Sequence, residues 1–598
     1  MSANGRTVIR FVIWGFLYLI TGCGNDSTVL TSTSGTISGI ATAGAPLIGT
    51  VTIKDSNSTG IEKQVPIAAD GTYRIELYGL TPPFALRADG LVGSKFCQLY
   101  AVATSADING SINITPLTDL IVANIAGQSA KNYYDNSGYT SLTASEVNSA
   151  HNALLAILQP ILTAIDLPGT IDLLRTPFKV DHTGMDAVLD LIKVTIDKGI
   201  ATATLENIVT HETVINNFAT QTYSNAFTNT TDMRQAVTDI RAIVAQLKQY
   251  SSLFATGLPS STDPRLLALF DSESFLDKGR VLNVFLSAIT TSEHRIGLTT
   301  DVIIDSIDPI AGTASVQPIP IRKGGYLDQD NAKRYIKKNG IWLDQGDGWL
   351  AFAYLCSEGV YYPNSSPALD PVFQVGLSMT VQADQPGNAN VFYAVITGPG
   401  LPDTGVFLDF TDFGYNLFYA FKNDVKISLI PDNAVYTIDF YDYAFNLLAT
   451  FTQKLPKRPP KFAELSAAAF PVPTMQTLSD LFRFTGGDLG VAWTLPENLY
   501  TDSLLLRLSD SASGNKSSVT KGLDGNLTSI TLSLQPVTNT SVTFTPDTGW
   551  LIINAKDVYG RWFDTYVWSL PSVGTQQAHL KLLDSDTIHQ SQSKGWLP

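Results

Sequence analysis

The sequence contains few cysteines and histidines for its length. Three cysteines and six histidines occur in 598 residues, and they form neither a C-x-x-C-H motif nor a cluster with metal-site spacing. These absences exclude covalently attached haem and a thiolate zinc centre. Cys97 and Cys356 lie far apart, in segments that we expect to belong to different domains. We therefore expect two buried free thiols, with a disulfide in an oxidising envelope as the alternative.

Positive charge is also scarce. The chain has 39 Lys and Arg residues against 54 Asp and Glu, so its formal net charge is −15, and no basic stripe interrupts this excess. Such a chain repels nucleic acid and anionic lipid headgroups, and we expect no nucleic-acid partner. Hydrophobic residues make up 44% and charged residues only 16%. This composition is too apolar for a disordered chain and is common in exported β proteins.

The common catalytic motifs are missing as well. The sequence has no G-x-S-x-G elbow, no P-loop and no G-x-G-x-x-G after a strand. His211-Glu212 begins a zinc-protease motif, but Ile215 stands where the second histidine ligand belongs. We therefore predict a protein that is not an enzyme, without catalytic residues, a metal or a cofactor.

The amino terminus has the pattern of an export signal. Arg6 and Arg10 precede an apolar run over residues 11–20, which is too short to cross a bilayer as a mature helix. The following Ile20-Thr21-Gly22-Cys23 resembles the lipobox of bacterial lipoproteins. That resemblance implies a signal peptide over 1–22 and lipidation of the Cys23 thiol.

A lipobox also implies a location and a partner. Stable attachment to a membrane needs more than one acyl chain, and mature lipoproteins usually carry three. Gly24 follows the cysteine, and the absence of an Asp there favours the outer membrane, facing the periplasm or the cell surface. Residues 23–34 would form a polar tether. Loss of Arg6 and Arg10 leaves the mature chain at −17 (37 − 54).

Residues 35–114 alternate apolar and polar positions between turn signals, which predicts a small antiparallel β-sandwich. Gly44 to Val51 and the hairpin signal Asp70 to Tyr73 resemble the carboxypeptidase-regulatory-like sandwich. In that family the module is a spacer or binding domain.

Residues 115–258 favour helices. Thr115-Pro116 marks a helix start, and Thr143 to Glu146 forms a capping box before a long apolar periodicity. Pro160 should kink or split that helix. Further amphipathic stretches at 185–200 and 233–250 lead us to predict an all-α domain of about five helices.

Residues 259–350 predict short helices followed by antiparallel strands, with a hairpin at Asn339-Gly340. This order resembles the α+β cone-like fold of nuclear transport factor two and its relatives, in which a curved sheet encloses an apolar cavity. The ligand-binding residues that the resemblance suggests are Tyr326, Tyr335, Trp342 and His294. Alternatively, the aromatic side chains are core residues and His294 is exposed.

The carboxyl-terminal part is β-rich. We expect a β-sandwich over 351–454, a stiff Pro-rich linker over 455–474, and a second β-sandwich over 475–575. Leu489 to Pro496 resembles the buried-Trp strand of fibronectin type III sandwiches. Residues 576–598 form a polar tail. The predicted fold class is therefore multidomain and β-rich with an all-α domain.

Three polar clusters are candidate ion sites. His182, Asp186 and Asp190 would share one helix face, as a metal or acid–base site; the simpler interpretation is a cap at Asp181 and a packed or solvated histidine. The turns at 55–60 and 328–331 are rich in Asp and Asn, but polar turns explain them more simply than calcium sites.

The functional prediction combines the anchor with the serial β units. We expect a non-enzymatic binding, adhesion or structural module of the cell envelope, whose partner is an envelope protein or a polysaccharide. The alternative is an enzyme or small-ligand carrier that uses the pocket of the cone-like module.

Overall fold

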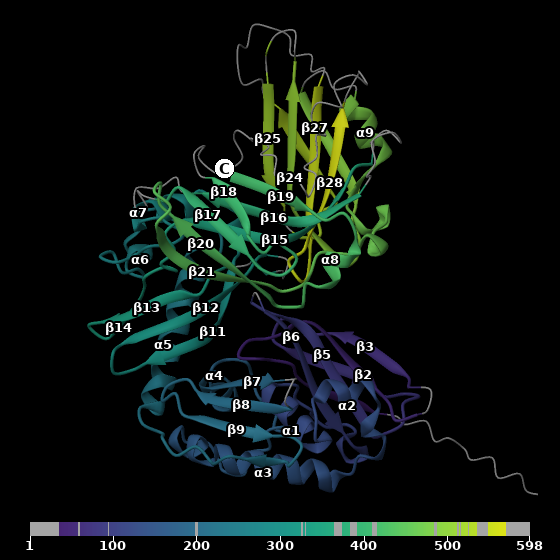
Figure 1. Ribbon diagram of the computed structural model, residues 1–598, viewed down its shortest axis with the longest axis vertical. Coiled ribbons are helices and arrows are strands. Elements are labelled where there is room, and N and C mark those ends of the chain that lie inside the picture. The colour runs from purple at the N-terminus through teal and green to yellow at the C-terminus, as the bar shows by residue number, and fades with distance from the viewer. Residues whose placement is uncertain are drawn as a thin grey trace, which may run out of the picture.

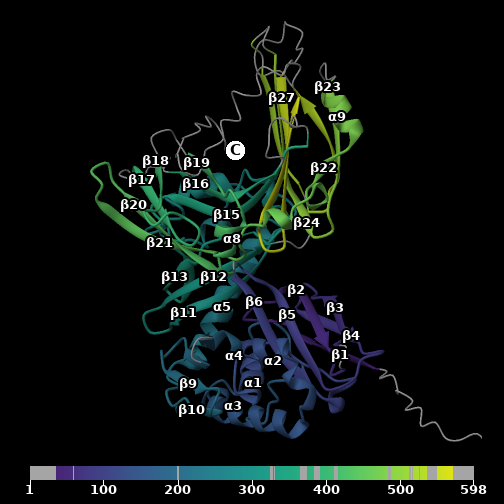
Figure 2. The ribbon, with the colours of Figure 1, turned by 45° about the vertical axis from the view of Figure 1, so that its right-hand side comes forward.

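The architecture comes from a computed structural model of residues 1–598, shown in Figures 1 and 2. Cys23, Tyr326, the predicted signal peptide, the tether and the polar tail lie outside the described residues. No described helix combines the length and apolar content that a membrane crossing requires. The structure describes residues 35–57, 60–93, 95–197, 201–323, 327–328, 330–363, 373–382, 391–409, 415–482, 487–510, 514, 516–523, 525–534 and 548–569.

The amino-terminal unit is a pair of antiparallel sheets, drawn in purple in Figure 1. One sheet has the order β1-β4 and the other β3-β2-β5-β6, with an apolar core between them. Gly71, at φ +84°, makes the turn before β4, and Asp70 Oδ1 accepts the Thr72 amide at 3.0 Å. The strands are β1 (Thr36–Ile40), β2 (Ile48–Lys54), β3 (Glu62–Pro66), β4 (Thr72–Glu76), β5 (Phe84–Val92) and β6 (Lys95–Ala103).

The next unit mixes helices with a sheet. Thr115 caps α1, and the Thr143–Glu146 capping box begins α3, which continues through Pro160 as one helix instead of splitting there. Between α4 and α5 along the chain, four strands form an antiparallel sheet in the order β10-β9-β8-β7. The elements are α1 (Pro116–Ala126), α2 (Ala130–Asp135), α3 (Ala144–Ala164), α4 (Gly184–Leu191), β7 (Ile192–Asp197), β8 (Thr202–Asn207), β9 (Thr213–Asn217), β10 (Thr222–Tyr223) and α5 (Met233–Leu253).

The all-α prediction for 115–258 is therefore wrong at strands β7 to β10. Helix α4 ends at Leu191, and the chain continues directly as β7, where Ile192, Val194 and Ile196 alternate with the more exposed Lys193, Thr195 and Asp197. Period-two alternation of β-branched residues favours a strand over a helix. Buried Asn124 on α1 and Asn216 on β9 exchange two side-chain hydrogen bonds of 2.9 Å, which join the helices to this sheet.

The third unit is a four-stranded antiparallel sheet in the order β11-β12-β13-β14. Helix α5 packs on this sheet, chiefly against β11 and β14. Asn339 and Gly340 make the predicted hairpin turn, with φ of +53° and +80°. The elements are α6 (Pro264–Leu267), α7 (Leu282–Ile289), β11 (Thr299–Asp308), β12 (Thr313–Ile321), β13 (Lys333–Lys338) and β14 (Ile341–Asp344).

The carboxyl-terminal part contains two sandwiches that share one seven-stranded sheet, β19-β16-β15-β28-β27-β24-β25. The first sandwich faces it with β18-β17-β20-β21 and the second with β22-β23-β26. The elements are β15 (Phe352–Tyr361), β16 (Phe373–Gln382), β17 (Tyr393–Thr397), β18 (Val406–Asp409), β19 (Tyr415–Ala420), α8 (Asp424–Ser428), β20 (Ala434–Tyr441), β21 (Leu447–Leu455), β22 (Val472–Pro473), α9 (Met475–Phe482), β23 (Gly487–Thr494), β24 (Leu499–Ser509), β25 (Lys516–Gly522), β26 (Ser529–Leu534), β27 (Thr548–Asp557) and β28 (Trp562–Ser569).

This shared sheet corrects the prediction of two sandwiches separated by a linker. Strands β15 and β28 pair in parallel, with Val360 opposite Asp564. The Pro-rich segment is packed: Pro459 and Pro460 are buried, and Phe470 contributes to a small core with Phe563. The separate sheets along the chain nevertheless confirm the β-rich, multidomain class.

Candidate functional site

The residues suggested for a pocket in the third unit do not form one together. Tyr335 and Trp342 are each 2% exposed and belong to the packed core, and Trp342 Nε1 donates to Asp239 Oδ1 at 3.1 Å. A cavity beside Tyr335 has a volume of about 80 Å³. Ligand pockets typically measure about 300–1,000 Å³, so this space is too small for an organic substrate.

His294 lies elsewhere, between the third unit and the second carboxyl-terminal sandwich. A Cβ atom at Gly522 on β25 would stand 1.1 Å from His294 Cε1, so the glycine permits the close approach of the ring. Burial, together with nearby Arg322, lowers the pKa of His294. The suggested grouping of His294 with Tyr335 and Trp342 is therefore wrong. The sequence could not show this, because β25 is more than two hundred residues further along the chain.

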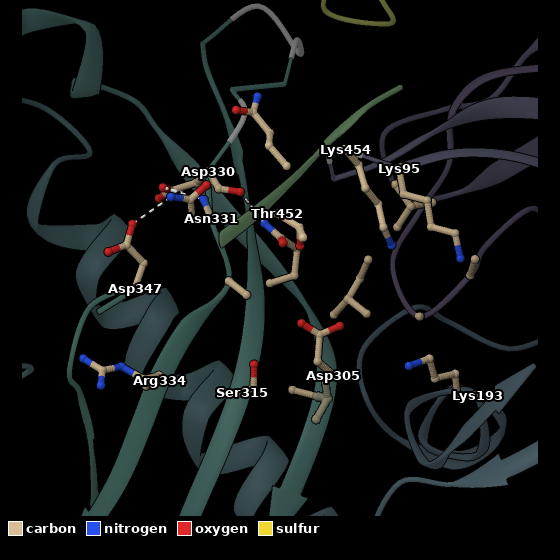
Figure 3. Close-up of a pocket in the computed structure, with 18 of the residues that line it drawn as sticks. Lys95, Lys193, Asp305, Ser315, Asp330, Asn331, Arg334, Asp347, Thr452 and Lys454 are labelled. Atoms are coloured by element: carbon tan, nitrogen blue, oxygen red, sulfur yellow. Dashed lines mark hydrogen bonds between the residues drawn. The ribbon is translucent and has the colours of Figure 1, made fainter. Parts of the chain in front are cut away.

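The structure contains a larger cavity, of about 570 Å³, where the amino-terminal sandwich, the β7 sheet, the third unit and the first carboxyl-terminal sandwich meet (Figure 3). Lys95 on β6, Lys193 on β7 and Lys454 on β21 line it together with Asp305 on β11. Figures 1 and 2 both place the third unit between the lower and upper parts of the molecule. Each of these four charged side chains comes from a different sheet.

Lys95, Lys193 and Lys454 are exposed at this part of the cavity, where they outnumber the carboxylates of Asp305 and the buried Asp190 (Figure 3). Within the described chain, none of the three ammonium groups lies within 4.0 Å of a carboxylate. Partial desolvation by the cavity walls, together with the charge of Lys95, lowers the pKa of Lys454. Partial desolvation also raises the pKa of Asp305, although the lysines act against that shift. These groups can therefore accept an additional anion, which would relieve the repulsion among the ammonium groups.

The opposite wall of the cavity is already neutralised by ion pairs. Asp330 accepts from Lys278 and Lys333, each at 3.1 Å, and Asn331 Nδ2 donates to Asp347 at 2.8 Å. Burial alone would raise the pKa of Asp330, but the two lysines lower it below its usual value. Asp330 and Asn331, in the turn predicted over 328–331, are therefore neither simply solvated nor free to act as calcium ligands.

Aromatic and amide side chains complete the lining. Trp349 and Phe451 stack with ring centroids 4.6 Å apart and an interplanar angle of 24°, and Phe352 lies beneath Lys278 Nζ at 5.7 Å. Gln317 and Gln453 add amide groups. Flat apolar faces beside hydrogen-bonding groups and cations are suited to a ligand that combines rings, hydroxyls and negative charge.

The polar cluster at the start of α4 borders the same cavity through Asp190. His182 Nδ1 lies 3.0 Å from Asp190 Oδ2, His182 Nε2 lies 3.4 Å from Asp301 Oδ1, and the His182 backbone amide donates to Asp186 Oδ2 at 2.7 Å. Burial alone would lower the pKa of His182, but the bonds to Asp190 and Asp301 raise it to about 10. Burial and the charge of Asp190 raise the pKa of Asp186 to about 7.

The predicted convergence of His182, Asp186 and Asp190 is thus present, but its backbone geometry differs from the prediction. His182 precedes the helix with φ +61°, outside the helical region. Thr183, not Asp181, occupies the capping position, and Asp181 Oδ1 instead accepts the Thr183 amide at 3.1 Å. The simpler interpretation of a cap and an ordinary packed histidine is therefore incomplete, because the histidine is held between carboxylates.

Asp55, at the start of the turn predicted over 55–60, has a structural role. Asp55 is fully buried, and its two carboxylate oxygens accept the backbone amides of Ile61 at 2.9 Å and Thr81 at 3.2 Å. Cys97 and Cys356 are both buried and unbridged, as expected for free thiols.

An aromatic patch is exposed on the first carboxyl-terminal sandwich. Tyr443 and Phe445 are 70% and 62% exposed, and Phe445 stacks on Tyr393 with centroids 4.7 Å apart. Phe392 and Phe407 extend the patch. The aromatic runs are visible in the sequence, but only the folded sandwich separates these residues from those in the core.

Comparisons with known proteins do not assign the chain to a family. No protein family matches the sequence, and a search of curated proteins found no match. A structure concerned with host cell surface retention of a 1.5-MDa bacterial ice-binding adhesin is 12% identical, covering 46% of this chain and 97% of that one, with a TM-score of 0.13. A tetra-tandem repeat from the extending region of a large adhesion protein is 11% identical, covering 90% and 98%, with a TM-score of 0.11.

A third match is to a Salmonella alpha-2-macroglobulin mutant. It is 9% identical and covers 88% of this chain and 31% of that one, with a TM-score of 0.14. Similarities this weak carry no argument about fold or function, so the functional inference depends on the cavity itself.

Proposed function

We propose that this chain is a lipid-anchored protein of the bacterial outer membrane, facing the periplasm or the cell surface, that binds an acidic saccharide without converting it. The lipobox-like sequence ending at Cys23 supports the anchor. The absence of the common catalytic motifs supports binding over catalysis. The partner would be an envelope polysaccharide, or a fragment of one, that carries carboxylate or sulfate groups.

The observation that carries this proposal is the lysine-lined cavity. Lys95, Lys193 and Lys454 face one cavity from three different sheets, without a carboxylate within 4.0 Å among the described residues. The net charge of the whole chain repels anions, so this local excess of positive charge favours a specific anionic ligand. The half-buried rings of Phe352 and Phe451 in the same cavity can pack against sugar rings.

The test is a binding array with acidic saccharides of one to three rings, each paired with a neutral analogue, and with acidic peptides. Wild-type protein is compared with the triple variant K95Q/K193Q/K454Q. A matched control, K248Q/K516Q/K521Q, removes the same charge from exposed positions outside the cavity.

We expect the wild type and the control to bind acidic saccharides in preference to their neutral analogues, and the cavity variant to lose at least about 10-fold in affinity. Added salt should weaken binding, because it screens the charges. Equal binding of acidic and neutral saccharides, binding of the peptides alone, or undiminished binding by the folded cavity variant would overturn the proposal.

A further inference from the structure

The cluster of His182, Asp186 and Asp190 has the geometry of a metal site. One candidate donor atom from each residue lies within 4.8 Å of the others, and all three residues are buried. Zinc–nitrogen and zinc–oxygen bonds measure about 2.0–2.2 Å, so two ligands on opposite sides of an ion are about 4 Å apart. Small side-chain rotations would close the cluster around one ion.

A second observation also points to a cation. Asp186 Oδ1 is buried and has no hydrogen-bond partner among the described residues, whereas Asp186 Oδ2 accepts the His182 amide at 2.7 Å. That amide bond holds the carboxylate in place, with one of its oxygens within 4.8 Å of donor atoms of His182 and Asp190. A buried carboxylate oxygen without a donor is unfavourable, and coordination to a cation would satisfy it.

The charge of the cluster favours the same occupant. Three carboxylates, from Asp186, Asp190 and Asp301, surround one imidazole. The guanidinium of Arg241 donates to the His182 carbonyl at 3.3 Å, and nearby positive charge partly offsets the excess. When all three aspartates are ionised, the carboxylates outnumber the cationic groups even with a protonated imidazole, and a divalent cation would balance them.

The donor set indicates the class of ion. One imidazole nitrogen with carboxylate oxygens suits zinc or manganese better than calcium or magnesium, which bind oxygen ligands almost exclusively. We propose that His182 Nδ1, Asp186 and Asp190 bind a divalent transition-metal ion, Zn²⁺ or Mn²⁺. His182 Nε2–H keeps its bond to Asp301, which orients the ring in the way that a carboxylate behind a metal-bound histidine usually does.

The cluster is buried, and its most exposed member is Asp301, whose side chain is 27% exposed. The Asp190 side chain is only 1% exposed, although the residue borders the large cavity. Metal binding displaces the proton from His182 Nδ1, which otherwise bridges to Asp190. The site is separate from the three lysines, so loss of metal binding and loss of saccharide binding are distinguishable results.

The experiment uses the full mature chain, stripped of metal with a chelator and titrated calorimetrically with ZnCl₂ and, separately, MnCl₂. We expect one high-affinity site per chain for at least one of these ions. D186N and D190N should each weaken it by more than about 100-fold, because even the loss of an outer partner costs 10–100-fold. H211Q is the matched control, since His211 is an exposed histidine beside Glu206.

A second measurement, on the wild-type chain, tests the proposal if the variants fail to fold. Co²⁺ added to the wild-type chain should produce the visible absorption of a protein-bound ion, and Zn²⁺ or Mn²⁺ should remove that absorption at one equivalent. Absence of stoichiometric binding by the wild type, unchanged affinity in folded D186N, or loss of the site in H211Q would each overturn the proposal. The cluster would then be an imidazolium held between aspartates.

Discussion

The side chains of Glu358 and Asp564 share a hydrogen bond across the parallel strands β15 and β28, at the point where the two carboxyl-terminal sandwiches join. Both residues are buried. Burial raises the pKa of Glu358 to about 7, and burial together with the neighbouring Glu358 raises the pKa of Asp564. The folded protein therefore holds a proton that the unfolded chain would release.

The stability of this junction should consequently fall as the pH rises. In the unfolded chain the Glu358 carboxyl loses its proton near its ordinary pKa of 4.5, whereas in the fold it keeps the proton up to about pH 7. Stability is thus fully present below pH 4.5 and is lost progressively up to pH 7, on the order of 3 kcal/mol for this shift. Urea unfolding at a series of pH values from 4.5 to 8 measures this decline in the free energy of unfolding.

E358Q is the informative variant for this prediction. Its amide can still donate to Asp564 but does not titrate, so the decline in stability with pH should be reduced. E293Q, at an exposed glutamate, should leave the decline unchanged. An unaltered pH profile in E358Q would show that the carboxyl pair is not its source.

The paired asparagines between α1 and β9 should contribute strongly to stability. Asn216→Ala removes both hydrogen bonds to Asn124 and leaves a buried amide with fewer partners, so we expect a loss of about 2 kcal/mol in the free energy of unfolding. Asn217→Ala, on the exposed face of the same strand, should cost less than about half as much. Chemical denaturation compares the two variants, and equal losses would contradict the account.

Charge changes of opposite sign in the cavity should have opposite effects on saccharide binding. D305N removes the carboxylate that competes with an anionic ligand for the lysines, so the affinity for the acidic saccharide should rise about 3- to 10-fold. K454Q should lower it. D403N, at an exposed position outside the cavity, is the control. A lower affinity of D305N for the acidic saccharide would show that the ligand binds elsewhere.

The anchor is tested at Cys23. C23A should move the mature protein from the membrane fraction to the soluble fraction and abolish incorporation of radiolabelled palmitate. C97A changes a buried thiol and should retain both properties. A C23A protein that remains in the membrane fraction after alkaline extraction would show that another segment holds it there.

Local signals in the sequence predicted local structure well. The cap at Thr115, the capping box at Thr143 and the hairpin at Asn339-Gly340 depend on residues within a few positions of each other. The error at β7 has the same local origin, because the short apolar run across α4 and β7 fits both a helix and a strand.

Features that depend on contacts between distant segments of the chain could not be predicted from the sequence. Parallel pairing of β15 with β28 joins segments about 200 residues apart, and no local pattern encodes it. Lys95, Lys193 and Lys454 are single lysines on ordinary strands, and only the packing of three units brings them to one cavity. The His182 cluster was partly visible, because Asp186 and Asp190 are one helical turn apart, whereas Asp301 joins it from β11.

The most direct test of the central claim is hydrogen–deuterium exchange with and without the acidic saccharide that binds most strongly in the array. We expect slower exchange in four segments that surround the cavity, on β6, β7, β11 and β21, and no such change in K95Q/K193Q/K454Q. Protection confined to the exposed aromatic patch around Tyr443 and Phe445, with the cavity strands unaffected, would contradict it.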